Sequence, residues 1–188
     1  TVRNGNIWTS NDSGATWTEN TSVGSTKHWI PITCSDDFTT LVTGVHNGNI
    51  WTSSDSGATW TERTIGDGSN KWMSISSSSD GTKLAALVYE GNIWISSNSG
   101  ATWTENTSTG AGKQWRQICS SSDGTKLAAT VRNGNIWTSK DGGKTWKEHN
   151  VGVISSQWMG IAMSGNGTIQ TAVEYDGFIW SSNNSGDT

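Results

Sequence analysis

The sequence is poor in the features that mark several large classes of protein. Its two cysteines cannot build a disulfide framework. The longest apolar run, at 84–88, is the length of one strand, far short of the roughly 20 residues that cross a bilayer. Basic residues number 12 against 16 acidic ones, and the formal net charge of −4 argues against a nucleic-acid partner. We therefore expect neither membrane insertion nor nucleic-acid binding.

Tryptophan is abundant, and its positions repeat. Only 31% of the 188 residues are hydrophobic, yet the 13 Trp side chains can each bury roughly 150–250 Å². A folded core is therefore expected. All of them fall into three columns spaced by 43 residues: Trp8, Trp51, Trp94, Trp137 and Trp180; Trp17, Trp60, Trp103 and Trp146; and Trp29, Trp72, Trp115 and Trp158.

The same 43-residue period governs a tetrapeptide and the turns around it. Gly-Asn-Ile-Trp occurs at 5–8, 48–51, 91–94 and 134–137, and Gly-Phe-Ile-Trp at 177–180. Such a period is typical of propellers, solenoids and other arrays. Within one unit, turn signals separate short strands expected over 114–120, 127–132, 135–139 and 145–148. Four strands per unit predict an all-β fold, a β-propeller of four-stranded antiparallel blades; a β-solenoid is the weaker alternative.

A second motif follows the third expected strand of each unit. Residues 10–17 read Ser-Asn-Asp-Ser-Gly-Ala-Thr-Trp, with copies at 53–60, 96–103 and 139–146 and a truncated copy at 182–188. This motif resembles the Asp-box, S-x-D-x-G-x-T-W, of the sialidase-like (BNR) repeat β-propeller family. Related boxes occur in sortilin-type receptor domains and in photosystem II assembly-factor propellers. The resemblance covers the whole chain and implies the propeller fold.

The box residues are interpreted as structural. We expect the Asp or Asn side chain to accept backbone N–H groups two or three residues on, the Gly to be left-handed, and the Trp to pack beneath the turn. Asn98 keeps such a turn but cannot act as an acid or nucleophile. The structural set is Asp12, Gly14, Trp17, Asp55, Gly57, Trp60, Asn98, Gly100, Trp103, Asp141, Gly143 and Trp146.

The resemblance implies a ligand face on the opposite side, built by the turns between second and third strands and by the loops that link units. Two adjacent turn columns supply candidates that hydrogen-bond hydroxyls or stack on sugars, although both also suit solvated turn flanks. They are Arg3, His46, Tyr89, Arg132 and Tyr175, followed by Asn4, Asn47, Glu90, Asn133 and Asp176. The linking loops, 20–28, 63–71, 106–114 and 150–157, each lead into a Trp that either stacks on sugar or, as we favour, fills space between blades.

No enzymatic site is expected. The sialidases of this resemblance need three clustered Arg, a Tyr–Glu pair and an Asp acid. Tyr89-Glu90 and Glu174-Tyr175 are sequence neighbours, whose side chains point to opposite faces of a strand. His28, His46 and His149 lack zinc-ligand spacing, so we expect no metal and no cofactor.

The domain organisation leaves three arrangements open. Residues 1–188 form one propeller domain or fragment of about four to five blades, with units starting near 29, 72, 115 and 158 and partial blades at 1–28 and 158–188. Either the N-terminal strands complete the C-terminal blade in a four- or five-bladed ring, or the chain is a segment of a longer array, or several chains share blades as a homo-oligomer. The ends within motifs favour a fragment of a larger extracellular protein.

The sequence favours an extracellular binding or scaffold module whose partners are glycans or proteins. Sequons give mild support for secretion, and a lumenal compartment is the alternative. The alternative functions are a fragment of a sialidase-like hydrolase and an assembly-factor propeller of a photosynthetic complex. The sequons lie at Asn11, Asn20, Asn106, Asn166 and Asn183.

Overall fold

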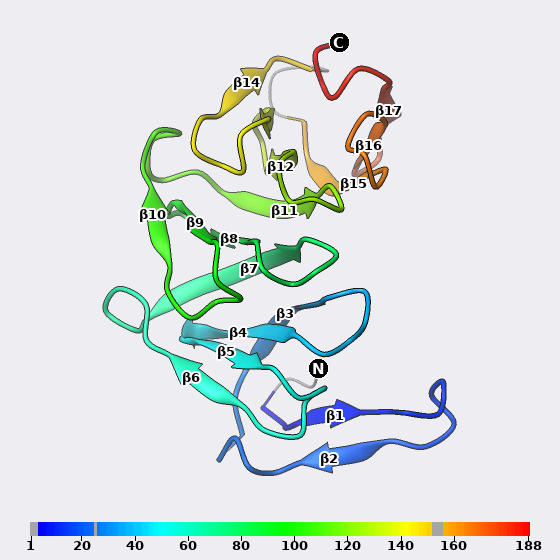
Figure 1. Ribbon diagram of the computed structural model, residues 1–188. Helices are drawn as coiled ribbons and strands as arrows, with labels where there is room; N and C mark the ends of the chain where they lie inside the picture. The colour runs from blue at the N-terminus through cyan, green and yellow to red at the C-terminus, as the bar shows by residue number, and fades with distance from the viewer. Residues whose placement is uncertain (1–3, 25, 152–155) are drawn as a thin grey trace.

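The computed structural model describes residues 4–24, 26–151 and 156–188. Over these ranges the regular elements are strands, β1 to β17, and no helix of a length and apolarity suited to crossing a membrane is found. The strands form five consecutive groups, which we call blades I to V, from β1 at the bottom of Figure 1 to β17 at the top. The all-β prediction is confirmed.

Blades II, III and IV each contain four antiparallel strands in chain order. Asp-Gly turns join the first two strands of blades III and IV. Blade II contains β3 (Trp29–Cys34), β4 (Leu41–Gly48), β5 (Ile50–Ser53) and β6 (Thr61–Arg63). Blade III contains β7 (Asn70–Ser77), β8 (Leu84–Val88), β9 (Ile93–Ser96) and β10 (Thr104–Asn106). Blade IV contains β11 (Trp115–Ser120), β12 (Leu127–Val131), β13 (Ile136–Ser139) and β14 (Lys147–His149).

The two end groups are smaller. Blade I contains the third and fourth strands of a unit, β1 (Ile7–Thr9) and β2 (Thr18–Asn20). Blade V contains the first three, β15 (Trp158–Met163), β16 (Gln170–Glu174) and β17 (Ile179–Ser182). Both groups keep the strand pairing of the interior blades.

The blades follow one another along an open arc. The first strands β3, β7, β11 and β15 contact each other in succession, which places them on the inner side. The strands of blade I do not contact those of blade V, and these two groups of strands lie at opposite ends of the arc (Figure 1). The described residues therefore form an open arc. Four periods of this packing turn the chain through less than a full circle.

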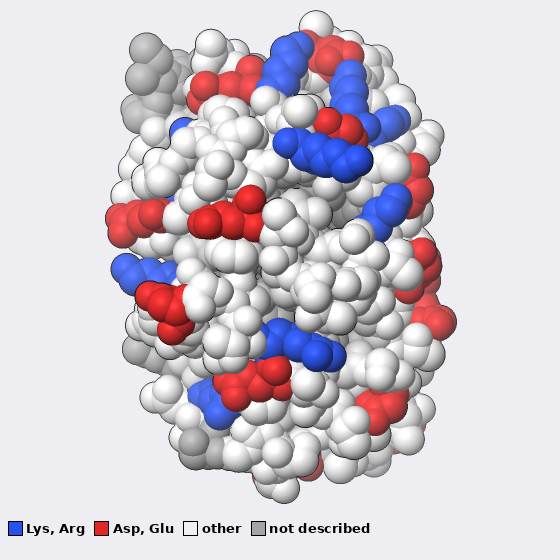
Figure 2. All heavy atoms as spheres, turned by 60° about the vertical axis from the view of Figure 1, so that its left-hand side comes forward, with Lys and Arg blue, Asp and Glu red and all other residues white. Residues whose placement is uncertain are grey.

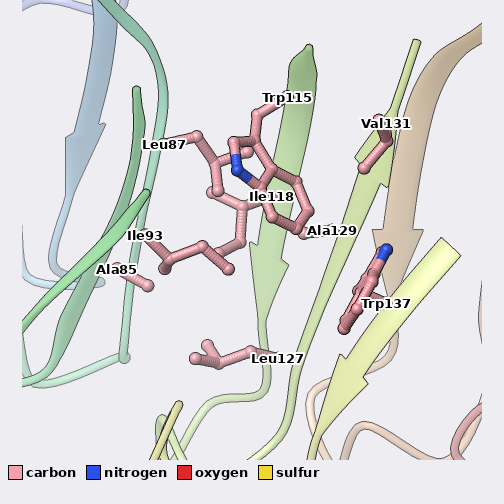
Figure 3. Close-up of a cluster of buried hydrophobic side chains, with 9 residues drawn as sticks. All are labelled: Ala85, Leu87, Ile93, Trp115, Ile118, Leu127, Ala129, Val131 and Trp137. Atoms are coloured by element: carbon pink, nitrogen blue, oxygen red, sulfur yellow. The ribbon is translucent and has the colours of Figure 1, made fainter. Parts of the chain in front are cut away.

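The core lies between blades rather than within them. Figure 3 shows the cluster between blades III and IV, where Leu87 and Ile93 of one blade face Trp115 of the next. Small residues on the second strand, such as Ala85 and Ala129, allow the two sheets to approach closely. Equivalent clusters fill the other three junctions. Each blade therefore depends on its neighbour for burial, as in other repeat proteins.

Tryptophan side chains at the start of the first strands also bond the blades together. Trp72, Trp115 and Trp158 are fully buried, and Trp29 is 3% exposed. Each indole N–H donates to the carbonyl of the Gly that opens the preceding Gly-Asn-Ile-Trp, as in the 3.2 Å bond from Trp115 Nε1 to Gly91. These rings fill inter-blade space and are not sugar-stacking platforms.

Main-chain hydrogen bonds join neighbouring blades on both sides of the arc. On the side of the Asp-boxes, the amide of Asp36 donates to Ser79, that of Ser79 to Ser122, and that of Ser122 to Gly165. On the other side, β4 pairs with β7, which merges blades II and III into one continuous sheet. This extra pairing forms because β4 and β7 extend by two to three residues beyond their counterparts β12 and β11, and each of the two blades still contains its four antiparallel strands.

Candidate functional site

The turns between second and third strands place the predicted column beside the start of the first strand. The amide of Tyr89 donates to the carbonyl of Lys71 at 2.9 Å, and that of Arg132 donates to Gln114 at 2.8 Å. His46 and Tyr175 make the same bond to His28 and Gln157, each at 2.8 Å. The tip residue and the residue before the first-strand Trp therefore lie side by side in every described blade that has both.

The tips of blades II, III and IV also reach the following blade. His46 pairs with Lys71 of blade III, and Arg132 forms a bridge to Gln157 of blade V. Between blades III and IV, the bridge runs from Gly91 to Lys113. The tip residues and the residues that precede the first-strand Trp consequently alternate along this side of the arc. We call the resulting row of residues the rim: His28, His46, Lys71, Tyr89, Gln114, Arg132, Gln157 and Tyr175.

Aromatic and basic side chains of the rim contact one another. The imidazole rings of His28 and His46 lie 5.2 Å apart, and Lys71 Nζ lies 5.8 Å from the centre of the Tyr89 ring. The same ammonium lies 3.9 Å from a carboxylate oxygen of Glu90. These contacts are half-exposed, so each contributes no more than about 1 kcal/mol to stability. The Tyr89, Lys71 and Glu90 side chains of blade III therefore remain partly exposed at the surface.

The second predicted column is constrained by backbone conformation. Asn4, Asn47 and Asn133 have φ of 53°, 56° and 55°, in the left-handed region that Asn tolerates. Glu90 and Asp176 take the same conformation, with φ of 58° and 50°. Since Glu is not favoured in the left-handed region, Glu90 stands out from its repeat equivalents.

Not every predicted candidate belongs to the described rim. Arg3 lies outside the described residues. Asp176 is exposed at the turn of blade V beside the rim residue Tyr175, which is 60% exposed, and is not itself part of the rim. The sequence named the linking loops as candidates without singling out their last residues, among them Lys71 and Gln114. Their position in the repeat could have identified them, because these residues immediately precede the buried Trp of each first strand.

The Asp-box on the opposite side is an internally bonded turn. In the first box, Asp12 accepts hydrogen bonds from the Thr16 amide at 2.8 Å, the Thr16 hydroxyl at 2.5 Å and the Ser10 hydroxyl at 2.8 Å. The amide that donates to Asp12 lies four residues further along the chain, not two or three as expected. The reason is that Ser13 and Gly14 both have left-handed backbone conformations, which widen the turn. The Trp17 indole donates to the Gly14 carbonyl at 3.1 Å.

These bonds account for the Asp residues without a catalytic role. The Thr16 hydroxyl, then its amide and the Ser10 hydroxyl, lower the pKa of Asp12 to about 2. Thr59 and Ser53 do the same for Asp55, whose pKa is also about 2. In the third box, Asn98 keeps both bonds to Thr102, through its amide oxygen and nitrogen. An amide thus replaces the carboxylate with the turn intact.

Several hollows lie between blades, and two of them are on the box side at the junctions of blades I and II and of blades III and IV. One of about 900 Å³ separates the boxes of blades I and II and is lined by Phe38, Asn20 and Asp55. Another of about 720 Å³ lies between blades III and IV, over Leu84, Ile95 and Leu127. None of the rim residues lines either hollow. The rim is a surface rather than the wall of these cavities.

Charges and cysteines add no competing site. On the face shown in Figure 2, acidic and basic side chains are interspersed, without a large area of one sign. Cys34 and Cys119 are free thiols; burial raises the pKa of Cys119 to about 12. Across the described ranges, no group of three His, Cys, Asp or Glu residues is arranged to hold a metal ion.

Comparisons with known proteins agree with this architecture. The family profile of the BNR-Asp box repeat matches residues 136–149, which span β13, the fourth box and β14. No curated protein matches the sequence significantly. The chain thus contains a BNR-Asp box repeat at residues 136–149, and its fold is that of a β-propeller.

Similar solved structures include binding proteins and enzymes. YCF48 from Cyanidioschyzon merolae aligns over 98% of this chain and 65% of its own, with a TM-score of 0.69 and 17% identity. The GH74 xyloglucanase from Xanthomonas campestris aligns over 98% of this chain and 34% of its own, with a TM-score of 0.75 and 18% identity. YCF48 bound to D1 peptide aligns over 79% and 51%, with a TM-score of 0.60 and 19% identity. This chain therefore spans less than two thirds of each, and these identities establish the fold alone.

Proposed function

We propose that this chain is a non-catalytic module that binds an extended partner, a glycan or a peptide, along the rim. The observation that carries the proposal is the row of exposed and half-exposed aromatic, basic and amide groups at matching positions of successive blades. Tyr89, Lys71 and Arg132 supply ring stacking, charge and hydrogen-bond donors within that row. The repeat spacing offers similar contacts to successive residues of a polymer.

The shape of the surface favours a chain-like partner over a small molecule. Sites for small ligands are concave and bury most of the ligand. The rim runs along the turns at one side of the arc and lies outside the two hollows on the box side. A polymer gains affinity from many such shallow contacts, because each linked contact adds to the others.

The placement of the carboxylates supports a role without catalysis. Glycoside hydrolysis generally needs two carboxyl groups about 5–10 Å apart around one bond. The acidic residues of the tips, Glu90 and Asp176, belong to blades III and V, with blade IV between them. The box residue Asp55 has a lowered pKa and three hydrogen bonds within its turn, which suit a structural anion rather than an acid.

A peptide-binding assembly factor is the second candidate. It is favoured by the likeness to YCF48, of which a structure with bound D1 peptide is known. The cellular location that we propose depends on which of the two partners the chain binds. We propose an extracellular location for a glycan-binding module and a lumenal one for an assembly factor.

The test is binding of the purified chain to glycan and peptide arrays. We expect Tyr89→Ala and Tyr175→Ala each to weaken binding at least tenfold. The matched control is Phe38→Ala, which removes a 45% exposed ring on the box side and should leave binding unchanged. An equal loss in all three variants, or no binding to either array, would contradict the rim as the site. Turnover of fluorogenic sialosides or xyloglucan above blank would overturn the non-catalytic role.

A further inference from the structure

The hollow of about 720 Å³ between blades III and IV is lined by residues that depart from the repeat. On the third strand of blade III, Ile95 stands where blades I, II and IV have Thr. In the box of blade IV, Lys144 stands where blades I, II and III have Ala, and Lys140 stands where they have Asn or Ser. These three substitutions meet in one hollow and give it a chemistry that its repeat equivalents do not share.

In the blades on either side, a larger side chain at the end of the fourth strand covers the equivalent place. In blade II, Arg63 Nε donates to Thr52 Oγ1 at 3.0 Å. In blade IV, His149 Nε2 lies 2.7 Å from Thr138 Oγ1. Thr52 faces the following blade, because a Cβ added at Gly100 in the next box would lie 2.8 Å from its Cγ2. Each contact therefore holds a large side chain over the face that turns toward the next blade.

Blade III has a different pair of residues at these positions. Asn106 replaces the Arg or His, and its amide donates to the carbonyls of Gly143 and Lys144 in the next box, at 2.7 and 3.0 Å. Ile95 replaces the Thr, and a Cβ added at Gly143 would lie 2.5 Å from its Cδ1. The short amide is thus bonded to the box rather than laid over the third strand, and the space beside Ile95 stays open.

The inner part of the hollow is apolar. Leu84, Ala85 and Leu127 are 2%, 1% and 3% exposed, and the half-buried Ile95 packs against the same cluster. In Figure 3 Leu127 lies at the end of the inter-blade cluster away from Trp115, which is the end on the box side. The hollow therefore opens onto the core between the two blades.

The outer part of the hollow carries three exposed lysines. Lys83 Nζ donates to the Asp123 carbonyl of blade IV at 2.8 Å, and Lys140 Nζ pairs with Asp187 at 2.8 Å. Lys144 has neither a hydrogen bond from its ammonium nor an ion pair among the described residues. An ammonium has three donors, so Lys144 and Lys83 have donors left for a ligand.

Two carboxylates also line the hollow, and both have partners. Asp141 accepts hydrogen bonds from the amide and hydroxyl of Thr145 within its own box. Glu105 accepts a hydrogen bond from the Asn92 amide at 2.9 Å. Since the cations outnumber the carboxylates and the free ammonium belongs to Lys144, the lining favours an anion.

The hollow between blades I and II is an internal comparison. It also lies beside a fourth-strand Asn, because Asn20 donates to the Gly57 carbonyl at 2.8 Å. Its lining includes Thr9 instead of Ile, the acids Glu19 and Asp55, and no Lys or Arg. An open junction thus exists at both places, but only the one between blades III and IV combines an apolar interior with cations.

We infer that the hollow between blades III and IV binds a small amphipathic carboxylate, with its apolar body against Leu84, Ile95 and Leu127 and its carboxylate at Lys144 and Lys83. The volume lies within the range of small-ligand sites, roughly 300–1,000 Å³. The site is on the box side and is independent of the rim, so neither depends on the other.

The direct test is calorimetric titration of the native chain with decanoate at low ionic strength. Decyltrimethylammonium, which has the same tail and the opposite charge, is the comparison ligand. We expect decanoate to bind at one site and decyltrimethylammonium to bind at least tenfold more weakly. Added salt should weaken the binding of decanoate, because the lysines are exposed.

Two variants take their residues from other blades. Ile95→Thr with Asn106→Arg reproduces the pair of blade II, so it should fold, as checked by circular dichroism, and should abolish decanoate binding. Lys144→Ala restores the residue of the first three boxes and should weaken decanoate at least fivefold without affecting decyltrimethylammonium. The matched control is Lys147→Ala, an exposed lysine outside the hollow, which should bind as the native chain does. No decanoate binding, equal binding of the two ligands, or unchanged binding in either hollow variant would overturn the inference.

Discussion

Replacing Trp115 by Phe tests whether the indole between blades stabilises the fold as the structure indicates. The side chain is 0% exposed and its N–H donates to the Gly91 carbonyl. The smaller ring removes roughly two methylene equivalents of buried surface, about 1.6 kcal/mol at about 0.8 kcal/mol each. Loss of the hydrogen bond adds about 1 kcal/mol. We expect the free energy of unfolding to fall by about 2–4 kcal/mol.

The control for this substitution lies in the first Asp-box. Trp17→Phe removes the same kind of bond, from the indole to the Gly14 carbonyl, but the ring is 59% exposed. Because little surface leaves water there, the expected loss is below about 1 kcal/mol. Urea titrations followed by far-UV circular dichroism measure both variants. Equal losses would refute the claim that the core lies between blades.

Three further effects follow from particular contacts. Phe38→Gly should raise the free energy of unfolding by about 1 kcal/mol, measured by thermal melting, because Phe38 has a φ of 61° where Gly81 and Gly124 stand in other blades. Asn106→Ala should lower it by about 1 kcal/mol in urea titrations, because the Asn106 amide donates to the Gly143 carbonyl at 2.7 Å across a blade junction. Stability should fall as the pH drops from about 4 to about 2, since Asp12, Asp55, Asp80 and Asp123 have folded-state pKa values of about 2 against an ordinary 3.8; denaturant titrations at several pH values check this, and a flat profile would contradict it.

Local features of the fold were predictable because each is encoded within one unit. The strand expected over 127–132 is β12 (Leu127–Val131), and that over 135–139 is β13 (Ile136–Ser139). The strand expected over 145–148 begins later, at Lys147, because the amide of Thr145 bonds to Asp141 and belongs to the box. Periodicity alone does not separate the last residues of a bonded turn from the first of a strand.

Relations between units were less predictable, because they depend on packing. The angle between sheets is set by how a ring such as Trp72 fits against Ile50, which the repeat pattern does not specify. For that reason the open arc could not be distinguished from a closed ring. The pairing of tip residues with the next blade is likewise tertiary, so His46 was predicted while its partner Lys71 was not singled out.

Departures from the repeat separate structural constraint from candidate specificity. The turn Gly residues of blades III and IV are needed twice, for a positive φ and because a Cβ at Gly124 would lie 2.8 Å from the Lys83 Cβ of the preceding blade. Phe38 has no such neighbour among the described residues, since blade I contains only β1 and β2. Packing therefore explains why Phe can occupy position 38, where blades III and IV have Gly.

Glu90 has no comparable structural explanation. It occupies a left-handed position that Asn fills in blade II and blade IV, and a side chain less suited to that conformation destabilises the turn. Its carboxylate instead lies beside Lys71, which also contacts Tyr89. A residue with an unfavourable backbone conformation, next to a half-exposed ring and a cation, supports the proposed binding surface. We therefore place the centre of the proposed site on blade III, where Glu90→Asn should stabilise the fold and weaken binding together.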